Sequence, residues 1–335
     1  MSKTLIIAEI GNNHNGNFKE AINGIMAAKK ANADCVKFQM IEPTKFVHSK
    51  LRTFNHAKTH KFQIERLQQM QFTLAQFIEL SRISRKNNLK FCLSIFDNYL
   101  IKKIKNHVDY IKISSGDINN YQLLSTVSKI NKPIIISTGA SNTKEIKRAL
   151  QFFPKNKPAI LHCVSSYPTP NDSLNLNSIK FLKDKFDNKI GYSDHSKGIE
   201  APIFAVAVGA KIIEKHFFTS LKNTNVGDKA VSIHTDQFKE MVKRIRILEK
   251  MLGNYGKDVL LLEKNMKNKI RRSIYYKNEM KKNQIVKESD ILYLRPYNKL
   301  GINKMDLHNN IYILKKNIKS NTIIQSKDFK IYKKK

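Results

Sequence analysis

Short apolar runs recur along the first two thirds of the chain, separated by segments of helical or loop character. Eight of these runs have the length and composition of buried β-strands. They cover residues 5–8, 35–39, 91–96, 108–113, 133–136, 159–164, 189–195 and 211–217. Runs with so few polar interruptions are typical of parallel sheets, whose strands are covered on both faces.

Most of the intervening segments carry apolar residues at helical spacing, as at Phe18, Ile22 and Ile25. Thr73 and Gln76 form a capping box, which predicts the start of a helix. Helices are also expected after Asn142, around residues 179–186, over residues 199–209 and from a cap at Thr235 to Leu252. Residues 41–70 are less regular, and we expect a long loop there.

Eight strands that alternate with helices or loops predict an α/β fold, a (β/α)8 TIM barrel. The alternative is an open doubly wound sheet. No GxGxxG motif follows the first strand, so the dinucleotide-binding form of that fold is not supported.

Polar residues cluster where the predicted strands end. They are Glu9, Lys37, Gln39, Ser94, Lys112, Ser115, Ser137, Ser165, Tyr167, His195 and His216. In a barrel these ends meet on one face, where catalytic groups lie. A purely structural barrel would have no reason to place lysines, a carboxylate and histidines at so many of them, since buried polar groups are costly unless paired or used.

The pattern changes toward the end of the chain. Residues 253–270 are rich in lysine and predict a partly helical linker that follows a barrel domain of residues 1–252. Short alternating segments then begin near Arg271, as in Ser273 to Tyr276 and Ile291 to Leu294. Residues 271–335 are therefore expected to form a small domain of β-rich character.

Composition narrows the class of protein. The 335 residues include three well separated cysteines, Cys35, Cys92 and Cys163, which argues against a disulfide framework and favours a reducing compartment. No secretory leader or long uncharged apolar stretch is present, so we expect a cytoplasmic protein without a membrane partner.

The formal net charge is +34, which raises the possibility of nucleic-acid binding. However, the lysines are scattered over the chain and no basic stripe is interleaved with aromatic residues. A genome that favours lysine, asparagine and isoleucine explains this charge, and no nucleic-acid partner is expected. The charge can still steer anionic substrates.

Several motifs stand together in order and spacing. They are Ala8-Glu9-Ile10-Gly11, Val36-Lys37-Phe38-Gln39, Lys112-Ile113-Ser114-Ser115-Gly116, Ile136-Ser137-Thr138-Gly139, His162-Cys163, Tyr167-Pro168-Thr169-Pro170, Ser193-Asp194-His195 and Glu214-Lys215-His216-Phe217. Together they resemble the bacterial sialic acid synthase family, which includes the legionaminic and pseudaminic acid synthases. The tail, with Arg271-Arg272-Ser273 and Leu294-Arg295-Pro296, is similar to the family's antifreeze-like (SAF) domain.

The resemblance implies an enzyme that condenses phosphoenolpyruvate with the open-chain aldehyde of an N-acylated amino sugar. The product is a nine-carbon 2-keto acid, and phosphate leaves by C–O cleavage. Lys37 and Lys112 would hold phosphoenolpyruvate, whose two anionic groups need compensating charge in a dry site. The hydroxyl groups of Ser94, Ser115, Ser137 and Ser193 would donate to the same anion, and Glu9 would do acid–base work.

A divalent metal is implied as well, manganese or magnesium by the family pattern, with His195 and His216 as its ligands. Their positions support this, because they end the predicted seventh and eighth strands, which are neighbours in a closed barrel. The alternative is one core histidine and one loop histidine. Two protein ligands would leave positions open for water and substrate.

Other positions are implied to contact the amino sugar. They are Gln39, Asp117, Ser165, Tyr167, the catalytic candidate Asp228, and Arg295 from the small domain. Family members form homodimers with exchanged terminal domains, so Arg295 would reach the site of a partner subunit.

This chain departs from the family pattern in places. Ser94-Ile95-Phe96 replaces Thr-Pro-Phe, Asp117 stands where glutamate is usual, and Asn225-Val226-Gly227-Asp228 replaces Gly-Pro-Asp. Two rival functions are a synthase for a different sugar aldehyde and a non-catalytic basic binding protein. The SAF-like tail argues against the first, and the intact polar residues at the strand ends argue against the second.

Overall fold

The computed structural model describes residues 3–53, 61–219, 228–302 and 304–334. Eight parallel strands pair in sequence order, and β1 pairs with β8 to close the barrel. The strands are β1 Leu5–Gly11, β2 Cys35–Met40, β3 Lys90–Ile95, β4 Tyr110–Ile113, β5 Ile134–Ser137, β6 Ala159–Cys163, β7 Ile190–Asp194 and β8 Ile212–Phe218. The predicted TIM barrel is confirmed, and a two-residue strand, β9 Ile233–His234, pairs in parallel with the end of β8.

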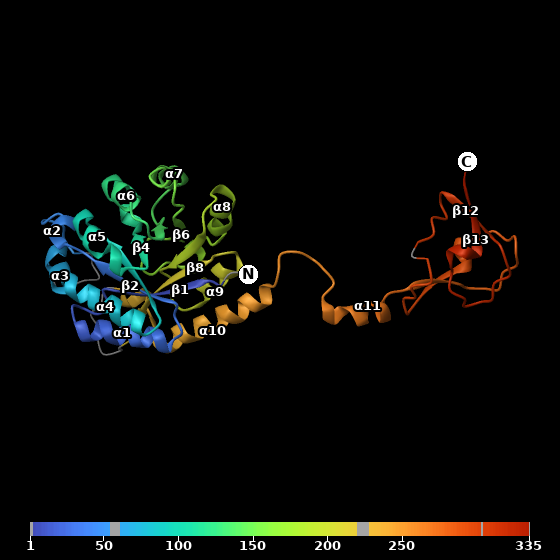
Figure 1. Ribbon diagram of the computed structural model, residues 1–335, viewed down its shortest axis with the longest axis horizontal. Coiled ribbons are helices and arrows are strands. Elements are labelled where there is room, and N and C mark those ends of the chain that lie inside the picture. The colour runs from blue at the N-terminus through green and yellow to red at the C-terminus, as the bar shows by residue number, and fades with distance from the viewer. Residues whose placement is uncertain (1–2, 54–60, 220–227, 303, 335) are drawn as a thin grey trace. The chain divides into compact units, whose positions relative to one another are not determined.

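Helices surround the strands on the outside of the barrel (Figure 1). They are α1 Phe18–Lys30, α2 Pro43–Phe46, α3 Gln63–Met70, α4 Leu74–Lys86, α5 Asn98–Ile104, α6 Tyr121–Val127, α7 Thr143–Leu150, α8 Asn177–Lys185, α9 Glu200–Ala207 and α10 Thr235–Leu252. None of the helices within the described part of the chain is long and apolar enough to cross a membrane.

The capping predictions are mostly confirmed. Thr73 accepts a hydrogen bond from the Gln76 backbone at 3.2 Å, and the Gln76 side chain accepts one from the Thr73 backbone at 2.9 Å. Asn142 caps α7 in the same way. The cap of α10 is His234 rather than Thr235, because the extended backbone before the helix ends one residue earlier. The expected loop over residues 41–70 was wrong in part, since α2 and α3 lie within it.

The main core lies between the strands and the helices, and a smaller apolar layer fills the amino-terminal half of the barrel interior. Ile7, Cys35, Cys92, Leu161 and Ile212 belong to this inner layer. The polar residues of the strands lie beyond it, toward the carboxyl ends. The strand sequences are therefore apolar on both faces at one end and mixed at the other.

The chain divides into two compact units, residues 1–254 and 255–335. In the second unit, α11 Lys264–Ile270 precedes two antiparallel pairs, β10 Ser273–Tyr276 with β11 Ile291–Leu294, and β12 Asn310–Leu314 with β13 Phe329–Lys333. Ile274, Tyr276, Leu314 and Ile324 are buried in a core of its own. The predicted β-rich character of the tail is confirmed.

An ionic cluster at the amino-terminal end ties α10 to the barrel. Arg246 contacts Asp34 at 2.5 Å and donates to the Thr4 carbonyl at 2.8 Å, while Glu249 accepts from the Thr4 backbone at 2.5 Å. These groups are mostly buried and join residues far apart in the sequence, so they hold α10 against the start of the first strand.

We expect Arg246→Met to lower the free energy of unfolding by about 2 to 3 kcal/mol, because charge-assisted bonds of this kind are worth about 1.5 to 3 kcal/mol. Urea denaturation of the variant and the parent protein measures the difference. Lys243→Met, whose exposed side chain lies on the same helix, is the control and should change stability little. Equal stability of Arg246→Met and the parent would contradict the assignment.

His14 makes stability depend on pH. Its ring is buried, stacks on Phe72 with 4.2 Å between centroids and accepts a hydrogen bond from the Gly16 backbone at 3.1 Å. Burial lowers its pKa to about 4, against 6.5 in the unfolded chain. Between pH 6.5 and pH 4, His14 is therefore protonated in the unfolded chain but not in the folded protein. Stability falls as the pH drops through this interval.

We expect this single group to remove about 3 kcal/mol of stability over that interval, since each pKa unit corresponds to 1.36 kcal/mol. His14→Gln, which does not titrate, should lose less stability on acidification than the parent protein. Denaturation curves at pH 7 and pH 4.5 compare the two, and parallel losses would show that His14 does not titrate differently on unfolding.

Candidate active site

The polar residues predicted at the strand ends surround one cavity of about 520 Å³. Those that line it are Lys37, Gln39, Lys112, Ser115, Asp117, Ser137, Ser165, Tyr167, Ser193, His195 and His216. Glu9 lies against Lys37, and the Lys37 Nζ lies 3.3 Å from Ser94 Oγ. Asp228 lies 3.9 Å from the His216 Nδ1. Arg295 belongs to the second unit, so its predicted reach into a cavity stays a prediction.

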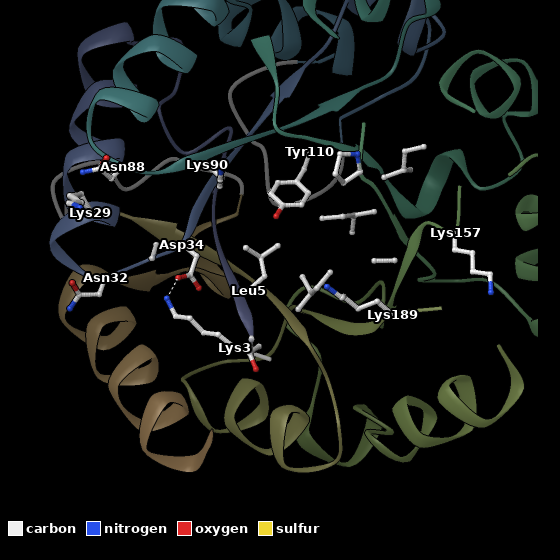
Figure 2. Close-up of a pocket in the computed structure, with 17 residues that line it drawn as sticks. Lys3, Leu5, Lys29, Asn32, Asp34, Asn88, Lys90, Tyr110, Lys157 and Lys189 are labelled. Atoms are coloured by element: carbon white, nitrogen blue, oxygen red, sulfur yellow. Dashed lines mark hydrogen bonds and ion pairs between the residues drawn. The ribbon is translucent and has the colours of Figure 1, made fainter. Parts of the chain in front are cut away.

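A larger cavity, of about 710 Å³, lies at the opposite mouth of the barrel. Figure 2 shows its lysine side chains spread around the strand starts, with Lys3 bonded to Asp34. Among the residues that the structure describes, no histidine or cysteine lines it, and its surface lysines reflect the high lysine content of the whole chain. Because the amino-terminal face of a TIM barrel contributes mainly to stability, we do not assign the chemistry there.

Lys37, Lys112 and Glu214 form the floor of the 520 Å³ cavity, and Glu9 lies against Lys37. Lys37 is paired with Glu9 and lies 3.5 Å from Glu214, and Lys112 lies 3.8 Å from Glu214. Ser193 donates to Glu214 at 3.1 Å. The strand register places these groups together, since Glu9 pairs with Lys37 and Ser193 pairs with Glu214.

The two carboxylates differ in their electrostatic surroundings. Burial raises the pKa of Glu9, and the nearby Lys37 only partly offsets this. Burial also disfavours the charged form of Glu214, but Lys112 and Lys37 outweigh it and hold the pKa of Glu214 below its usual range. When the surroundings move the pKa values of two carboxylates apart in this way, the two groups can take different roles. Glu9 can exchange a proton, and Glu214 stays ionised.

His195 and His216 lie side by side, with 5.5 Å between ring centroids. The His195 Nδ1 lies 2.8 Å from the Val164 carbonyl, which assigns the proton to Nδ1 and leaves Nε2 with a free lone pair. The His216 Nδ1 is buried without a hydrogen-bond partner in the described part of the chain. Burial lowers the pKa of His195 to about 4 and that of His216 to about 3, so both rings are neutral donors at pH 7.

This donor pair fits a divalent metal, because neutral imidazoles with unused nitrogens are good ligands for such ions. Within the described ranges, no cluster of three or more His, Cys, Asp or Glu residues is arranged around one point. That His195 and His216 hold such an ion stays a prediction.

Tyr167 covers the metal-binding candidates from the outside. Its ring stacks on His195 with 4.0 Å between centroids and meets the edge of His216 at 6.2 Å, yet half of its surface is exposed. Asp117 lies near the same mouth, held by Asn120 at 3.2 Å. Lys37 and Lys112 are buried whereas Tyr167 is half exposed, so the cavity has a cationic floor and a more exposed mouth.

The serine positions depend on a close backbone approach at Gly139. The Gly139 backbone donates to Ser115 Oγ at 3.0 Å, and a Cβ on Gly139 would lie 2.2 Å from Ser165 Oγ. Only glycine fits there without displacing the hydroxyl groups. Ser137 Oγ is buried and has no hydrogen-bond partner among the described residues, which leaves it available to a ligand.

Sequence reasoning missed several residues of the cavity. Glu214 is the most central, and it could have been found, since the period of two places it on the same face of β8 as His216. Cys163 lies 3.7 Å from His195. Lys45, Phe46 and Phe96 line the mouth, with Phe46 and Phe96 rings 4.5 Å apart, and no periodic signal marks them.

Comparison with known proteins supports one family. The NeuB family model matches residues 24–257. An uncharacterized protein of Methanocaldococcus jannaschii is 39% identical over 297 residues, 88% of this chain and 85% of that protein. The N,N'-diacetyllegionaminic acid synthase of Campylobacter jejuni is 35% identical over 315 residues, 91% of this chain and 93% of that enzyme.

A solved structure agrees with these matches. The N-acetylneuraminic acid (sialic acid) synthetase of Leptospira borgpetersenii superposes with a TM-score of 0.69 at 32% identity, over 79% of this chain and 90% of that one. The fold, the motif order and these matches confirm the resemblance that the sequence indicated. The chain therefore belongs to the NeuB family.

Proposed function

We propose that this protein, a NeuB-family nonulosonic acid synthase that uses phosphoenolpyruvate, condenses it with the open-chain aldehyde of an N-acylated amino sugar. N-acetylmannosamine and a 2,4-diacetamido-trideoxyhexose are the sugars to be tested. The observation that carries the proposal is the buried floor of the cavity, where Lys37 and Lys112 flank Glu214 beside two neutral histidines.

Lys37 and Lys112 bind the phosphate and carboxylate of phosphoenolpyruvate, because a dry site must supply positive charge to such an anion. The hydroxyl groups of Ser94, Ser115, Ser137 and Ser193 donate to the same anion. In the structure, Ser94 accepts a hydrogen bond from Lys37, and Ser193 donates one to Glu214. The phosphate and carboxylate of the substrate would replace Glu9 and Glu214 as the ion-pair partners of the two lysines.

Glu9 donates a proton to the aldehyde oxygen, which becomes a hydroxyl group as the new C–C bond forms between the enolpyruvyl methylene and the aldehyde carbon. Its raised pKa makes both protonation states accessible. Glu214 stays ionised and stabilises positive charge developing at C2 before water adds there and phosphate leaves by C–O cleavage. His195 and His216 would hold Mn²⁺ or Mg²⁺, which polarises oxygen atoms when bound.

The amino sugar occupies the mouth of the cavity, above phosphoenolpyruvate. Gln39, Asp117, Ser165 and Tyr167 line this region and carry the hydrogen-bonding groups that such a sugar needs. Asp228 lies beside His216 at the same end. Arg295 would complete the sugar site from a partner subunit.

The proposal is tested by phosphate release. We expect release only when phosphoenolpyruvate, Mn²⁺ or Mg²⁺ and an N-acylated hexosamine are all present, measured in a coupled phosphate assay with a panel of sugars. Release from phosphoenolpyruvate without a sugar, or with arabinose or erythrose 4-phosphate in place of the amino sugar, would contradict it.

We further propose a cytoplasmic homodimer with exchanged second units. The three cysteines are all free and buried, which suits a reducing compartment. The start of the second unit exposes an apolar group, Val259, Leu260, Leu261 and Leu262, with Leu261 and Leu262 each 81% exposed. A contiguous exposed group of this kind marks an interaction site.

Leu261→Glu with Leu262→Glu should convert the dimer to a monomer, because two charges would have to be buried in the subunit contact. Light scattering coupled to size exclusion measures the mass. Leu300→Glu, at another exposed leucine of the second unit, is the control and should leave the mass unchanged. A double variant with the mass of the parent protein would exclude this segment from the contact.

A further inference from the structure

A buried ion pair lies on the outer side of the barrel wall, behind the two histidines. Lys215 stands between Glu214 and His216 on β8, and its side chain points to the opposite face because side chains alternate along a strand. Asp194 stands between Ser193 and His195 in the same way. The Lys215 Nζ lies 2.6 Å from Asp194 Oδ2, and neither side chain has exposed surface.

The pair also holds the backbone that follows β7. Lys215 donates to the Ser196 carbonyl at 2.5 Å, and Asp194 Oδ1 accepts from the Ser196 backbone at 2.9 Å. Tyr192 donates to the same Asp194 oxygen at 2.9 Å. Residues on both sides of His195 are thus bonded to the residue next to His216.

A buried ion pair does not by itself show that the fold is stabilised by it. Removing two charges from water costs several kcal/mol per ion, and apolar replacements of similar volume are often neutral or stabilising. The register pairs Asp194 with Lys215 directly, so their bond lies across the β7–β8 seam that carries His195 and His216. A contact at this place constrains the spacing of the two rings.

We propose that Lys215 and Asp194 are positioning residues that fix the spacing of His195 and His216 and thereby set the affinity of the site for a divalent metal. The inference rests on the proposed function, in which these histidines hold the metal. Groups that orient metal ligands from behind typically change metal affinity by about 10- to 100-fold.

The experiment titrates Mn²⁺ alone into the full-length protein by calorimetry, alongside thermal unfolding of each sample. Lys215→Met should bind Mn²⁺ about 10- to 100-fold more weakly than the parent protein. It should also unfold at lower temperature, because the Asp194 charge is left buried without its partner. Arg246→Met, which breaks an ion pair at the other end of the barrel, should lose stability and keep its Mn²⁺ affinity.

The double variant Lys215→Met with Asp194→Asn separates positioning from stability. It removes both charges, and the asparagine oxygen still accepts from Tyr192 and Ser196. We expect its unfolding temperature to recover toward that of the parent protein while Mn²⁺ binding stays weak, because no bond joins residue 215 to the Ser196 carbonyl.

Three results would overturn the inference. One is unchanged Mn²⁺ affinity in folded Lys215→Met, and another is joint recovery of affinity and stability in the double variant. The third is an equal loss of affinity in Arg246→Met, which would show that affinity only follows stability. A parent protein that binds no Mn²⁺ would overturn the metal assignment as well, and this outcome is distinct from the other three.

Discussion

Lys112→Met should lower kcat/KM for phosphoenolpyruvate by about 10²- to 10³-fold, the usual cost of removing one preorganised donor from an anion site. Lys112 is buried and lies 3.8 Å from Glu214. Its loss removes one of the two charges that offset the substrate anion. It also leaves Glu214 with Lys37 as its remaining cation on the cavity floor, which raises the pKa of Glu214.

Steady-state phosphate release measures this effect, and circular dichroism checks that the variant is folded. Lys129→Met, an exposed lysine on the barrel surface, is the matched control and should keep the activity of the parent protein. The interpretation fails if folded Lys112→Met keeps a kcat/KM within about threefold of the parent value, since the floor lysine would then not bind the anion.

His216→Ala should abolish metal-dependent turnover. The ring has a buried Nδ1 without a hydrogen-bond partner in the described ranges, and burial lowers its pKa to about 3, so it is built as a neutral donor. With one of two protein ligands gone, Mn²⁺ affinity and kcat should both fall, and kcat by at least about 10³-fold because the chemistry depends on the bound ion.

The readouts are Mn²⁺ titration and phosphate release over a range of Mn²⁺ concentrations. His308→Ala removes an exposed histidine of the second unit and should leave both unchanged. An undiminished rate in His216→Ala would remove this residue from the metal site, whatever the state of His195.

The barrel was predictable because each strand is buried on both faces, and so appears in the sequence as an apolar run. The polar strand ends were predictable for a related reason, since Lys37 or His216 would be costly in a buried strand without a use. Period-two alternation also predicts Glu214 on the same face of β8 as His216.

Other features depend on contacts that no local pattern reveals. Lys45 and Phe46 reach the cavity from the short helix α2. Its segment of the sequence shows neither the helical period of 3.6 residues nor the strand period of two. The bond between Lys215 and Asp194 depends on the register of two strands. Strand β13 was missed because its lysines resemble a solvated tail, although Phe329 anchors it in the second core.

The fate of the oxygen atom that bridges carbon and phosphorus in phosphoenolpyruvate is the most direct test of the proposed reaction. Phosphoenolpyruvate labelled with ¹⁸O at the bridging position is incubated with the protein, Mn²⁺ and the best amino sugar of the panel, and the products are analysed by mass spectrometry. We expect a nine-carbon 2-keto acid without label and phosphate that carries the ¹⁸O, because phosphate leaves by C–O cleavage. Label retained in the keto acid, or labelled phosphate without a nine-carbon product, would contradict it.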